Sequence, residues 1–221
     1  MIGRYFAGLE NEIFPERTAI GLLKESSLRY GENPHQNAAV YEDAMTTSLM
    51  TGMTQLHGKE LSFNNLNDLN TALELASEFE EPAVAVIKHA TPCAAAIGST
   101  IYEAFVRAYE ADKMSIFGGI VAMNKEMDAE TATAMDEIFL EIVAAPSYSE
   151  QALEILKKKK NLRILVINFN NNKSALDVKF TSGKVLIQET DNLNYEKLET
   201  VTTTAPTKAQ LDDMKFAMIV C

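Results

Sequence analysis

The sequence is short of three things that would each point to a class of protein: cysteine, long apolar runs and positive charge. Its 221 residues include two cysteines, Cys93 and Cys221, so neither a disulfide framework nor a zinc site of four cysteines is available. No apolar run approaches the roughly 20 residues that cross a bilayer, and the apolar part of residues 1–6 is too short for a signal peptide. We therefore expect a cytoplasmic protein in a reducing compartment, with no membrane contact.

The charge balance also limits the partners. The 20 lysines and arginines are outnumbered by 31 aspartates and glutamates, which leaves a net charge of −11. Nucleic-acid binding needs clustered basic side chains to neutralise phosphates. The one basic run, 157–160 with Arg163, fits either a nucleic-acid patch or an exposed helix end favoured by the helix dipole, and we favour the second. We expect no nucleic-acid partner, so any anion must bind at a local site.

The composition is that of a soluble globular protein with a sizeable core, 47% hydrophobic and 23% charged. From residue 63 the pattern alternates between helix and strand. Helices are predicted at 65–80, 93–110, 128–140 and 149–158, and strands at 83–88, 117–123, 142–145 and 162–167. Strands separated by such helices favour right-handed crossovers and a mainly parallel sheet covered on both faces. The predicted fold class is α/β.

The pattern changes after residue 168. Segments 178–180 and 184–188 flank a Ser-Gly pair and predict an antiparallel hairpin. The threonine-rich stretch 198–208 is typical of a linker, and 209–221 begins a further apolar helix or strand that stops. We interpret this end as a truncation inside a second module.

Lys88 and His89 close the apolar run 83–87. A cation and an imidazole are costly at the end of a buried strand unless something uses them. Taken alone, the pair fits two roles: Lys88 extends to solvent while His89 bonds a carbonyl, or both face a ligand. Ligands of open parallel sheets bind beyond the carboxyl ends of strands, which is where we expect this pair.

Two polar segments are further candidates. Residues 28–36 pack hydrogen-bonding and turn-forming side chains without a helical or strand period, as in a loop that shapes a site or in a solvated linker. Within them Arg29 offers a planar fork for a phosphate and Tyr30 a flat face for a base, which suggests a nucleotide. At a predicted helix start, Asn65 and Asp68 either cap free amides or reach a ligand.

Two weaker signals concern glycine and metal. Gly118, inside Phe117-Gly118-Gly119 at a strand start, allows either a close backbone approach to a ligand or a bulge. Pro92-Cys93 resembles one arm of a zinc deaminase motif, but the position three residues after Cys93 is Ala96. No metal site is therefore predicted.

Five short motifs follow one another along the chain in a fixed order. They are Arg29-Tyr30-Gly31-x-Asn33-Pro34-His35-Gln36, Ser62-Phe63-x-Asn65-x-x-Asp68, Lys88-His89-x-x-Pro92-Cys93, Phe117-Gly118-Gly119 and Ala145-Pro146-Ser147. This series closely resembles the formyltransferase half of the AICAR transformylase/IMP cyclohydrolase family of bifunctional purine biosynthesis proteins, from about Phe6 to the end of the chain. The resemblance implies formyl transfer from 10-formyltetrahydrofolate to the 5-amino group of aminoimidazole carboxamide ribonucleotide (AICAR).

The resemblance also implies residue roles. His89 would take the proton from the attacking amine, while Lys88 would stabilise the tetrahedral intermediate and protonate the leaving nitrogen. It assigns substrate contacts to Arg29, Tyr30, Asn65, Gly118 and Glu141. It further implies a three-layer α/β/α, cytidine-deaminase-like subdomain without zinc, a homodimer with active sites across its interface, and a potassium site in the full-length protein.

The chain departs from the family pattern in two places. Ala94 stands where the family usually has Gly, beside the catalytic pair, and Ser182-Gly183-Lys184 replaces a common Ser-Gly-Gly. We expect the first to bear on turn geometry and the second to be structural.

The resemblance divides the chain into three parts. These are an N-terminal segment with the substrate loop (1–40), a first transformylase subdomain (41–197), and a linker with the start of a second subdomain (198–221). The preceding cyclohydrolase domain has no counterpart, so we expect no ring closure, and little or no transferase activity from an incomplete fragment. Two other functions stay open: a ribotide-binding module without chemistry, and a structural dimerisation domain.

Overall fold

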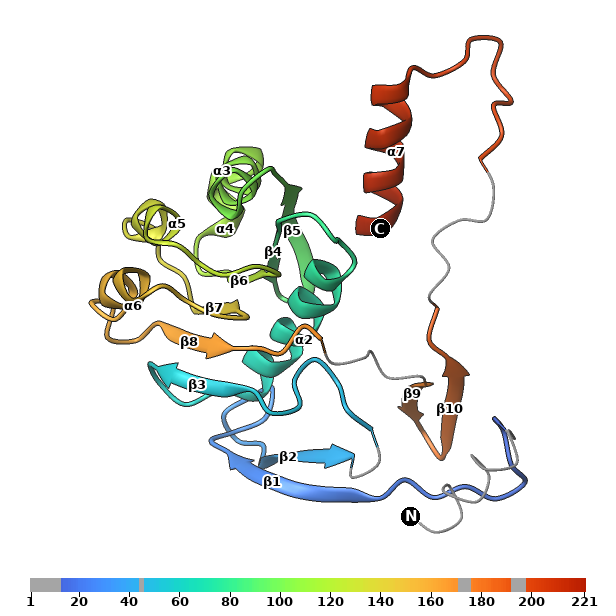
Figure 1. Ribbon diagram of the computed structural model, residues 1–221. Coiled ribbons are helices and arrows are strands. Elements are labelled where there is room, and N and C mark those ends of the chain that lie inside the picture. The colour runs from blue at the N-terminus through green and yellow to red at the C-terminus, as the bar shows by residue number, and fades with distance from the viewer. Residues whose placement is uncertain (1–12, 44–45, 171–175, 192–197) are drawn as a thin grey trace.

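The computed structural model describes residues 13–43, 46–170, 176–191 and 198–221 (Figure 1). The strands are β1 (Leu22–Leu28), β2 (Ala38–Asp43), β3 (Thr54–His57), β4 (Ala83–Lys88), β5 (Thr91–Ile97), β6 (Ile120–Met123), β7 (Ile142–Ala145), β8 (Arg163–Val166), β9 (Leu176–Thr181) and β10 (Lys184–Glu189). The helices are α2 (Phe63–Ser77), α3 (Ile101–Ala111), α4 (Lys113–Ile116), α5 (Ala129–Met135), α6 (Glu150–Leu156) and α7 (Lys208–Val220).

A six-stranded sheet of order β3-β8-β7-β6-β4-β5 forms the middle layer. Alternate strand residues face its two sides. Ala85, Ile87 and Leu165 pack with α2 on one face, whereas Val86, Val121 and Ile164 pack with α3 to α6 on the other. Figure 1 shows this layering. The predicted three-layer α/β fold is confirmed.

The strand directions refine the expected sheet. Strands β6, β7 and β8 are parallel; β4 is antiparallel to β6 and to β5, and β3 is antiparallel to β8. Strands β5 to β8 therefore run one way, so the sheet is mainly parallel, but β4 and β3 run against them. Our expectation that β4 joins β6 by a parallel crossover is wrong.

The reversal comes from a strand that sequence periodicity missed. We expected a helix over 93–110, but residues 91–97 form β5, which pairs with β4. The two central residues of the connecting turn, His89 and Ala90, have φ of 55° and 57°, as a type I′ hairpin requires. The alanine-rich segment has high helix propensity, and pairing with β4 overrides it.

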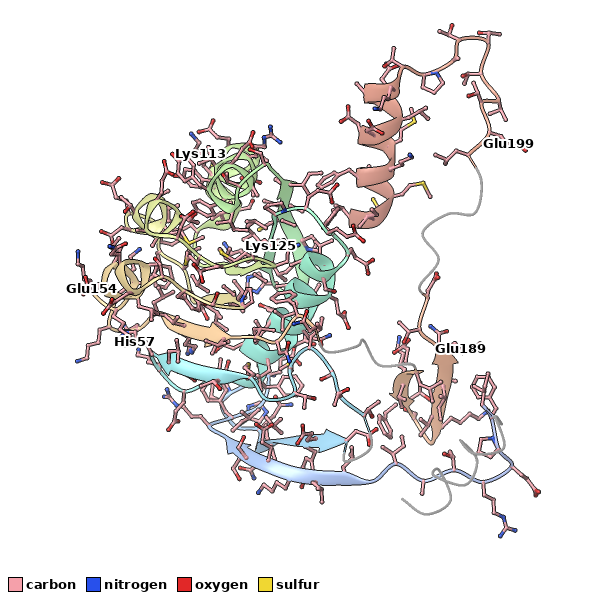
Figure 2. The ribbon with its side chains drawn as sticks, viewed as in Figure 1. His57, Lys113, Lys125, Glu154, Glu189 and Glu199 are labelled. Carbon is pink, nitrogen blue, oxygen red and sulfur yellow. The ribbon has the colours of Figure 1, made fainter. Side chains whose placement is uncertain are left out.

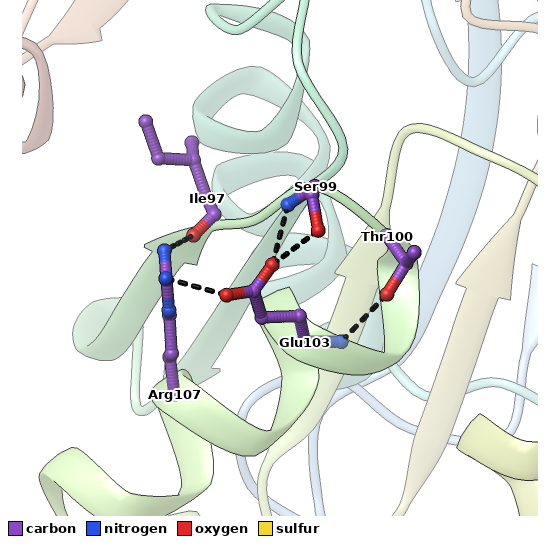
Figure 3. A network of polar contacts seen from close by, with 5 residues as sticks. All are labelled: Ile97, Ser99, Thr100, Glu103 and Arg107. Atoms are coloured by element: carbon purple, nitrogen blue, oxygen red, sulfur yellow. Dashed lines mark hydrogen bonds and ion pairs between the residues drawn. The ribbon is translucent and has the colours of Figure 1, made fainter.

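Helix α3 therefore begins later than expected, and its start is well fixed. Thr100 caps it by accepting a hydrogen bond from the Glu103 amide. Figure 3 shows the Glu103 carboxylate bonded to Ser99 and to Arg107, whose Nη1 also donates to the Ile97 carbonyl at 2.9 Å. This network joins the end of β5 to the first turns of α3.

Three elements lie outside the sandwich. The predicted hairpin appears as β9–β10, and β1–β2 forms a second one. After residues 198–207, which have no helix or strand, α7 packs through Val220 against the α2 side of the core and stacks Phe216 on Phe79 at 5.4 Å between ring centroids. In the described part of the chain, no helix combines the length and apolarity that crossing a membrane demands.

Candidate functional site

Most of the predicted site residues lie at one end of the strands of the central sheet. Because β4 runs against β6, its carboxyl end lies beside the amino ends of the parallel strands: Ile87 pairs with Ile120, which pairs with Ile142. We call the residues at this end of the strands, 88–90, 117–119, 141 and 163, the site edge. Lys88 and His89 lie at the carboxyl end of β4, as we expected. This is the amino end of the parallel strands β6 to β8, however, and not the carboxyl end at which ligands of open parallel sheets bind.

Lys88 and His89 differ in how they are held. The Lys88 ammonium donates to the Phe117 carbonyl at 2.9 Å, which connects the end of β4 to the start of β6. His89 is exposed and forms no side-chain hydrogen bond with any described residue. Its turn is fixed by Asp68, which accepts from the Ala90 amide at 2.7 Å. A left-handed conformation is uncommon outside glycine, and here it presents the imidazole to solvent.

Asn65 caps a helix, one of the two roles that the sequence left open, and its side chain also contacts another predicted site residue. It is 5% exposed and forms a capping box with Ser62 at the start of α2. Its amide Nδ2 also donates to Glu141 Oε2 at 2.8 Å. This bond joins two of the predicted substrate-binding residues across 76 positions of sequence.

Glu141 lies just before β7 and is positioned by its backbone. Its amide donates to the Gly119 carbonyl at 3.0 Å, and its own carbonyl accepts from the Arg163 amide at 3.1 Å. The side chain is 43% exposed. The carboxylate therefore lies on the sheet edge with one side toward the protein and the other toward solvent.

Arg163 is a site residue that the sequence analysis misplaced. We grouped it with the exposed lysines, but its side chain is 13% exposed, with Nη1 3.8 Å from Glu141 Oε2 and Nε donating to the Glu60 carbonyl at 3.0 Å. Burial lowers the pKa of Arg163, and the neighbouring Glu141 carboxylate opposes that shift. The missed signal was a cation at one end of an apolar strand: Arg163 begins β8, as Lys88 ends β4.

The basic run itself is also not wholly exposed. Lys159 donates from Nζ to the carbonyls of Met135 and Ile138, at 2.8 and 2.6 Å, and burial lowers its pKa. It thus binds carbonyls at and just after the C-terminal end of α5. His57, at the end of β3 in Figure 2, has its Nε2 3.2 Å from the Lys159 carbonyl oxygen, so a backbone contact accounts for this histidine.

The Arg29–Gln36 loop is ordered by its own hydrogen bonds. The Gly31 amide donates to the Gln36 carbonyl at 2.8 Å, and Asn64 at the start of α2 donates to the Glu32 carbonyl at 3.3 Å. The Arg29 guanidinium lies 5.4 Å from the centre of the Tyr30 ring, within range of a cation–π contact. The loop is therefore attached beside Asn65, as a site-shaping loop would be.

Gly118 has a φ of 77°, a conformation that glycine adopts without strain. Its amide donates to the Phe139 carbonyl at 2.8 Å. Beside it, the rings of Phe117 and Phe139 lie 5.3 Å apart and are 59% and 50% exposed. This exposed aromatic pair was not singled out from the sequence, although large apolar groups left in water beside polar ones often mark a binding surface.

Two features bear on metal and thiol chemistry. No group of three or more His, Cys, Asp or Glu in the described ranges is arranged to hold a metal ion. Cys93 is partly buried in β5, its thiol donates to the Val86 carbonyl at 3.4 Å, and burial raises its pKa. A thiol with a raised pKa is a poor nucleophile, so Cys93 packs rather than reacts.

Comparison with known proteins gives a consistent result. The sequence model of the family described as "AICARFT/IMPCHase bienzyme" matches residues 1–221. The bifunctional purine biosynthesis protein PurH of Thermoanaerobacter sp. (strain X514) is 48% identical over 219 residues, covering 98% of this chain and 43% of the relative. The PurH proteins of Anoxybacillus flavithermus and Clostridioides difficile are each 47% identical, over 98% and 100% of this chain. The chain spans 43 to 44% of the length of these relatives.

Proposed function

Because the chain belongs to the AICARFT/IMPCHase bienzyme family of purine biosynthesis, we propose that it carries the AICAR-binding and proton-transfer part of the formyltransferase. In this proposal the co-substrate is 10-formyltetrahydrofolate, and the protein works as a homodimer. The observation that supports it is the meeting of Lys88, His89, Asn65 and Glu141 at the site edge, next to the Arg29–Tyr30 loop.

The geometry fits the proton transfers that the reaction needs. The amine nitrogen of AICAR attacks the formyl carbon, a C–N bond forms, and the amine must lose a proton. The His89 imidazole has no hydrogen-bond partner among the described residues, so a ring nitrogen is available to accept that proton. The bond from the formyl carbon to the folate nitrogen then breaks, and that nitrogen takes a proton from Lys88.

Lys88 has a second role before it gives up its proton. The ammonium is fixed by the Phe117 carbonyl, which leaves two of its three N–H donors for the negative oxygen of the tetrahedral intermediate. Since the donor is already in place, little rearrangement is needed when the charge develops.

The remaining residues suit a ribonucleotide. Arg29 is exposed and offers paired donors for the phosphate. Glu141 accepts hydrogen bonds at its outward side, and Gly118 leaves its Cα open to an approaching ligand. Because the net charge is −11, an anionic ligand depends on these local cations rather than on the overall field.

Calorimetric titration of this chain with AICAR tests the proposal. We expect binding that is lost with the phosphate-free riboside and weakened at least tenfold in Arg29→Ala and Lys88→Ala, since each removes a charged contact. Lys125→Ala, at the other end of the sheet, is the matched control and should bind normally. Equal affinity for AICAR and the riboside, together with equal AICAR affinity of the native chain and Lys88→Ala, would contradict the proposal.

Catalysis needs its own assay. A full-length relative carrying the substitution that corresponds to His89→Ala should lose folate-dependent turnover by 10²-fold or more, roughly the contribution of a general base, while AICAR still binds. Unchanged turnover would favour the ribotide-binding module that the sequence left open.

A further inference from the structure

Two side chains from distant parts of the sequence converge on one carboxylate oxygen of Glu141. Glu141 Oε2 accepts from Asn65 Nδ2 at 2.8 Å and lies 3.8 Å from Arg163 Nη1. Arg163 is itself fixed from behind, because its Nε donates to the Glu60 carbonyl at 3.0 Å. Glu141 Oε1 has no hydrogen bond to any residue in the described ranges. One oxygen is thus held by the protein, and the other is left for something else.

This arrangement limits the freedom of Glu141. A glutamate that is 43% exposed would ordinarily sample several rotamers, which costs binding energy when a ligand requires one of them. The neutral Asn65 amide by itself gives a modest hydrogen bond. The guanidinium adds attraction to the same oxygen, and because its side chain is 13% exposed, water screens this attraction less than at an open surface.

The local packing also excludes a purely surface role for Arg163. Its backbone amide donates to the Glu141 carbonyl, so the two residues are adjacent in the sheet as well as through their side chains. Tyr30, from the predicted substrate loop, is close enough to act on the charge of Arg163. The guanidinium is therefore near both the loop and the carboxylate.

We infer that Arg163 is a positioning residue that orients Glu141 and, through the shared oxygen, the amide of Asn65 for ligand binding. The ligand assignment rests on the proposed function, but the orientation itself does not. Arg163 acts through Glu141 and makes no contact with the ligand.

The first experiment needs no ligand. In a ¹⁵N-labelled chain, the side-chain amide protons of Asn65 report the bond to Glu141. We expect Arg163→Met to speed their exchange with solvent about fivefold, the effect of a coupling of roughly 1 kcal/mol. Arg163→Lys should restore part of the protection. Arg107→Met is the matched control, since Arg107 likewise binds a glutamate and a backbone carbonyl, but on α3.

The second experiment measures AICAR affinity of the same variants. We expect about a fivefold weaker Kd in Arg163→Met, no change in Arg107→Met, and no further loss when Arg163→Met is added to Glu141→Gln, because the effect passes through Glu141. If Arg163→Met does not fold, Arg163→Gln keeps a donor for the Glu60 carbonyl, removes the charged Nη groups that lie near Glu141, and should show the same changes.

The outcomes separate the two proposals. If Arg163→Met speeds Asn65 side-chain amide exchange but the native chain does not bind AICAR, the positioning role is supported and the proposed function is refuted. Unchanged Asn65 exchange would overturn the positioning role, whatever the affinity. A loss of affinity that persists in the Glu141→Gln background would also overturn it, since Arg163 would then contact the ligand directly.

Discussion

The two ends of the central sheet carry polar groups that are used in opposite ways. At the far edge, where β6 to β8 end, Asn124 is buried and fully bonded: its Oδ1 accepts from the Ala83 amide at 2.9 Å, and its Nδ2 donates to the carbonyls of Phe79 and Glu81 at 2.7 and 2.8 Å. At the site edge His89 has no side-chain bond to a described residue, and Glu141 uses one oxygen. Saturated polar groups stabilise the fold, whereas unsaturated ones remain available for binding.

Tyr148 belongs to the same far-edge group. Its hydroxyl lies 2.9 Å from the Val143 carbonyl oxygen and 2.8 Å from that of Leu165, and burial raises its pKa. Tyr148 thus connects β7 to β8 from the loop that follows β7. The comparison predicts that far-edge substitutions change stability and leave ligand binding intact, with the reverse at the site edge.

The largest expected effect is on Asn124. Asn124→Ala leaves one amide and two carbonyls without partners in a buried position, which should lower the free energy of unfolding by about 3 kcal/mol. Urea unfolding measures this, and the exposed Asn161→Ala serves as control. A decrease of less than about 1 kcal/mol in the free energy of unfolding would show that water replaces the Asn124 side-chain amide. The two ends of the sheet would then differ less in their contribution to stability than we infer.

Tyr148→Phe should cost about 1 kcal/mol at neutral pH and should also change the pH dependence. The folded pKa of Tyr148 is raised, so the folded chain retains a proton that the unfolded chain loses above about pH 10. The stability due to this group is therefore complete below that pH and falls as the pH rises further, by about 1.4 kcal/mol per unit.

Unfolding measured between pH 8 and pH 11 tests this second prediction. The difference in stability between the native chain and Tyr148→Phe should shrink above about pH 10. Tyr41→Phe, at an exposed position in β2, is the control for the loss of a tyrosine hydroxyl. A constant difference over the range would mean that the Tyr148 hydroxyl ionises normally.

Gly118→Ala tests the site edge through its backbone. A side chain at a φ of 77° should cost about 1 kcal/mol of stability, while the added methyl meets only the Phe139 ring, at 3.6 Å. We expect a larger relative loss of AICAR affinity, measured by calorimetry, because the methyl occupies the approach to the backbone. Equal affinity would remove Gly118 from the site.

His89→Gly should have the smallest effect on stability. Glycine relieves the left-handed strain at φ 55° but raises the entropy of the unfolded chain, so the two terms nearly cancel and the change stays within about 1 kcal/mol. Under the proposed function, turnover in a full-length relative that carries the corresponding substitution should nevertheless fall with the loss of the imidazole. A large loss of stability would show that the His89 side chain stabilises the fold, as Asn124 and Tyr148 are expected to do.

Much of the sandwich could be predicted from the sequence, since β4, β7 and β8 are continuous apolar runs between helical patterns. Strand β5 could not, because Ala94 to Ala96 favour a helix by propensity and only the turn at His89 and the partner strand decide otherwise. Because β5 was not predicted, the direction predicted for β4 relative to β6 was also wrong.

The candidate site was predictable to a different degree. Family motifs indicated Asn65 and Glu141, but their bond depends on the strand order, which no local pattern encodes. Arg163 was missed because four neighbouring lysines suggested a solvent-exposed charge run. A cation at the terminal residue of a buried strand was the better signal: Arg163 is the first residue of β8, and Lys88 is the last residue of β4.

The turn at His89 and Ala90 also constrains loop length. Only two residues connect β4 to β5, and Ala94 faces the α3 side of the sheet while Ala95 faces the α2 side. One inserted residue that shifted β5 along β4 would exchange these faces along the whole strand. The imidazole therefore stands on a connection that tolerates changes of residue type far better than changes of length.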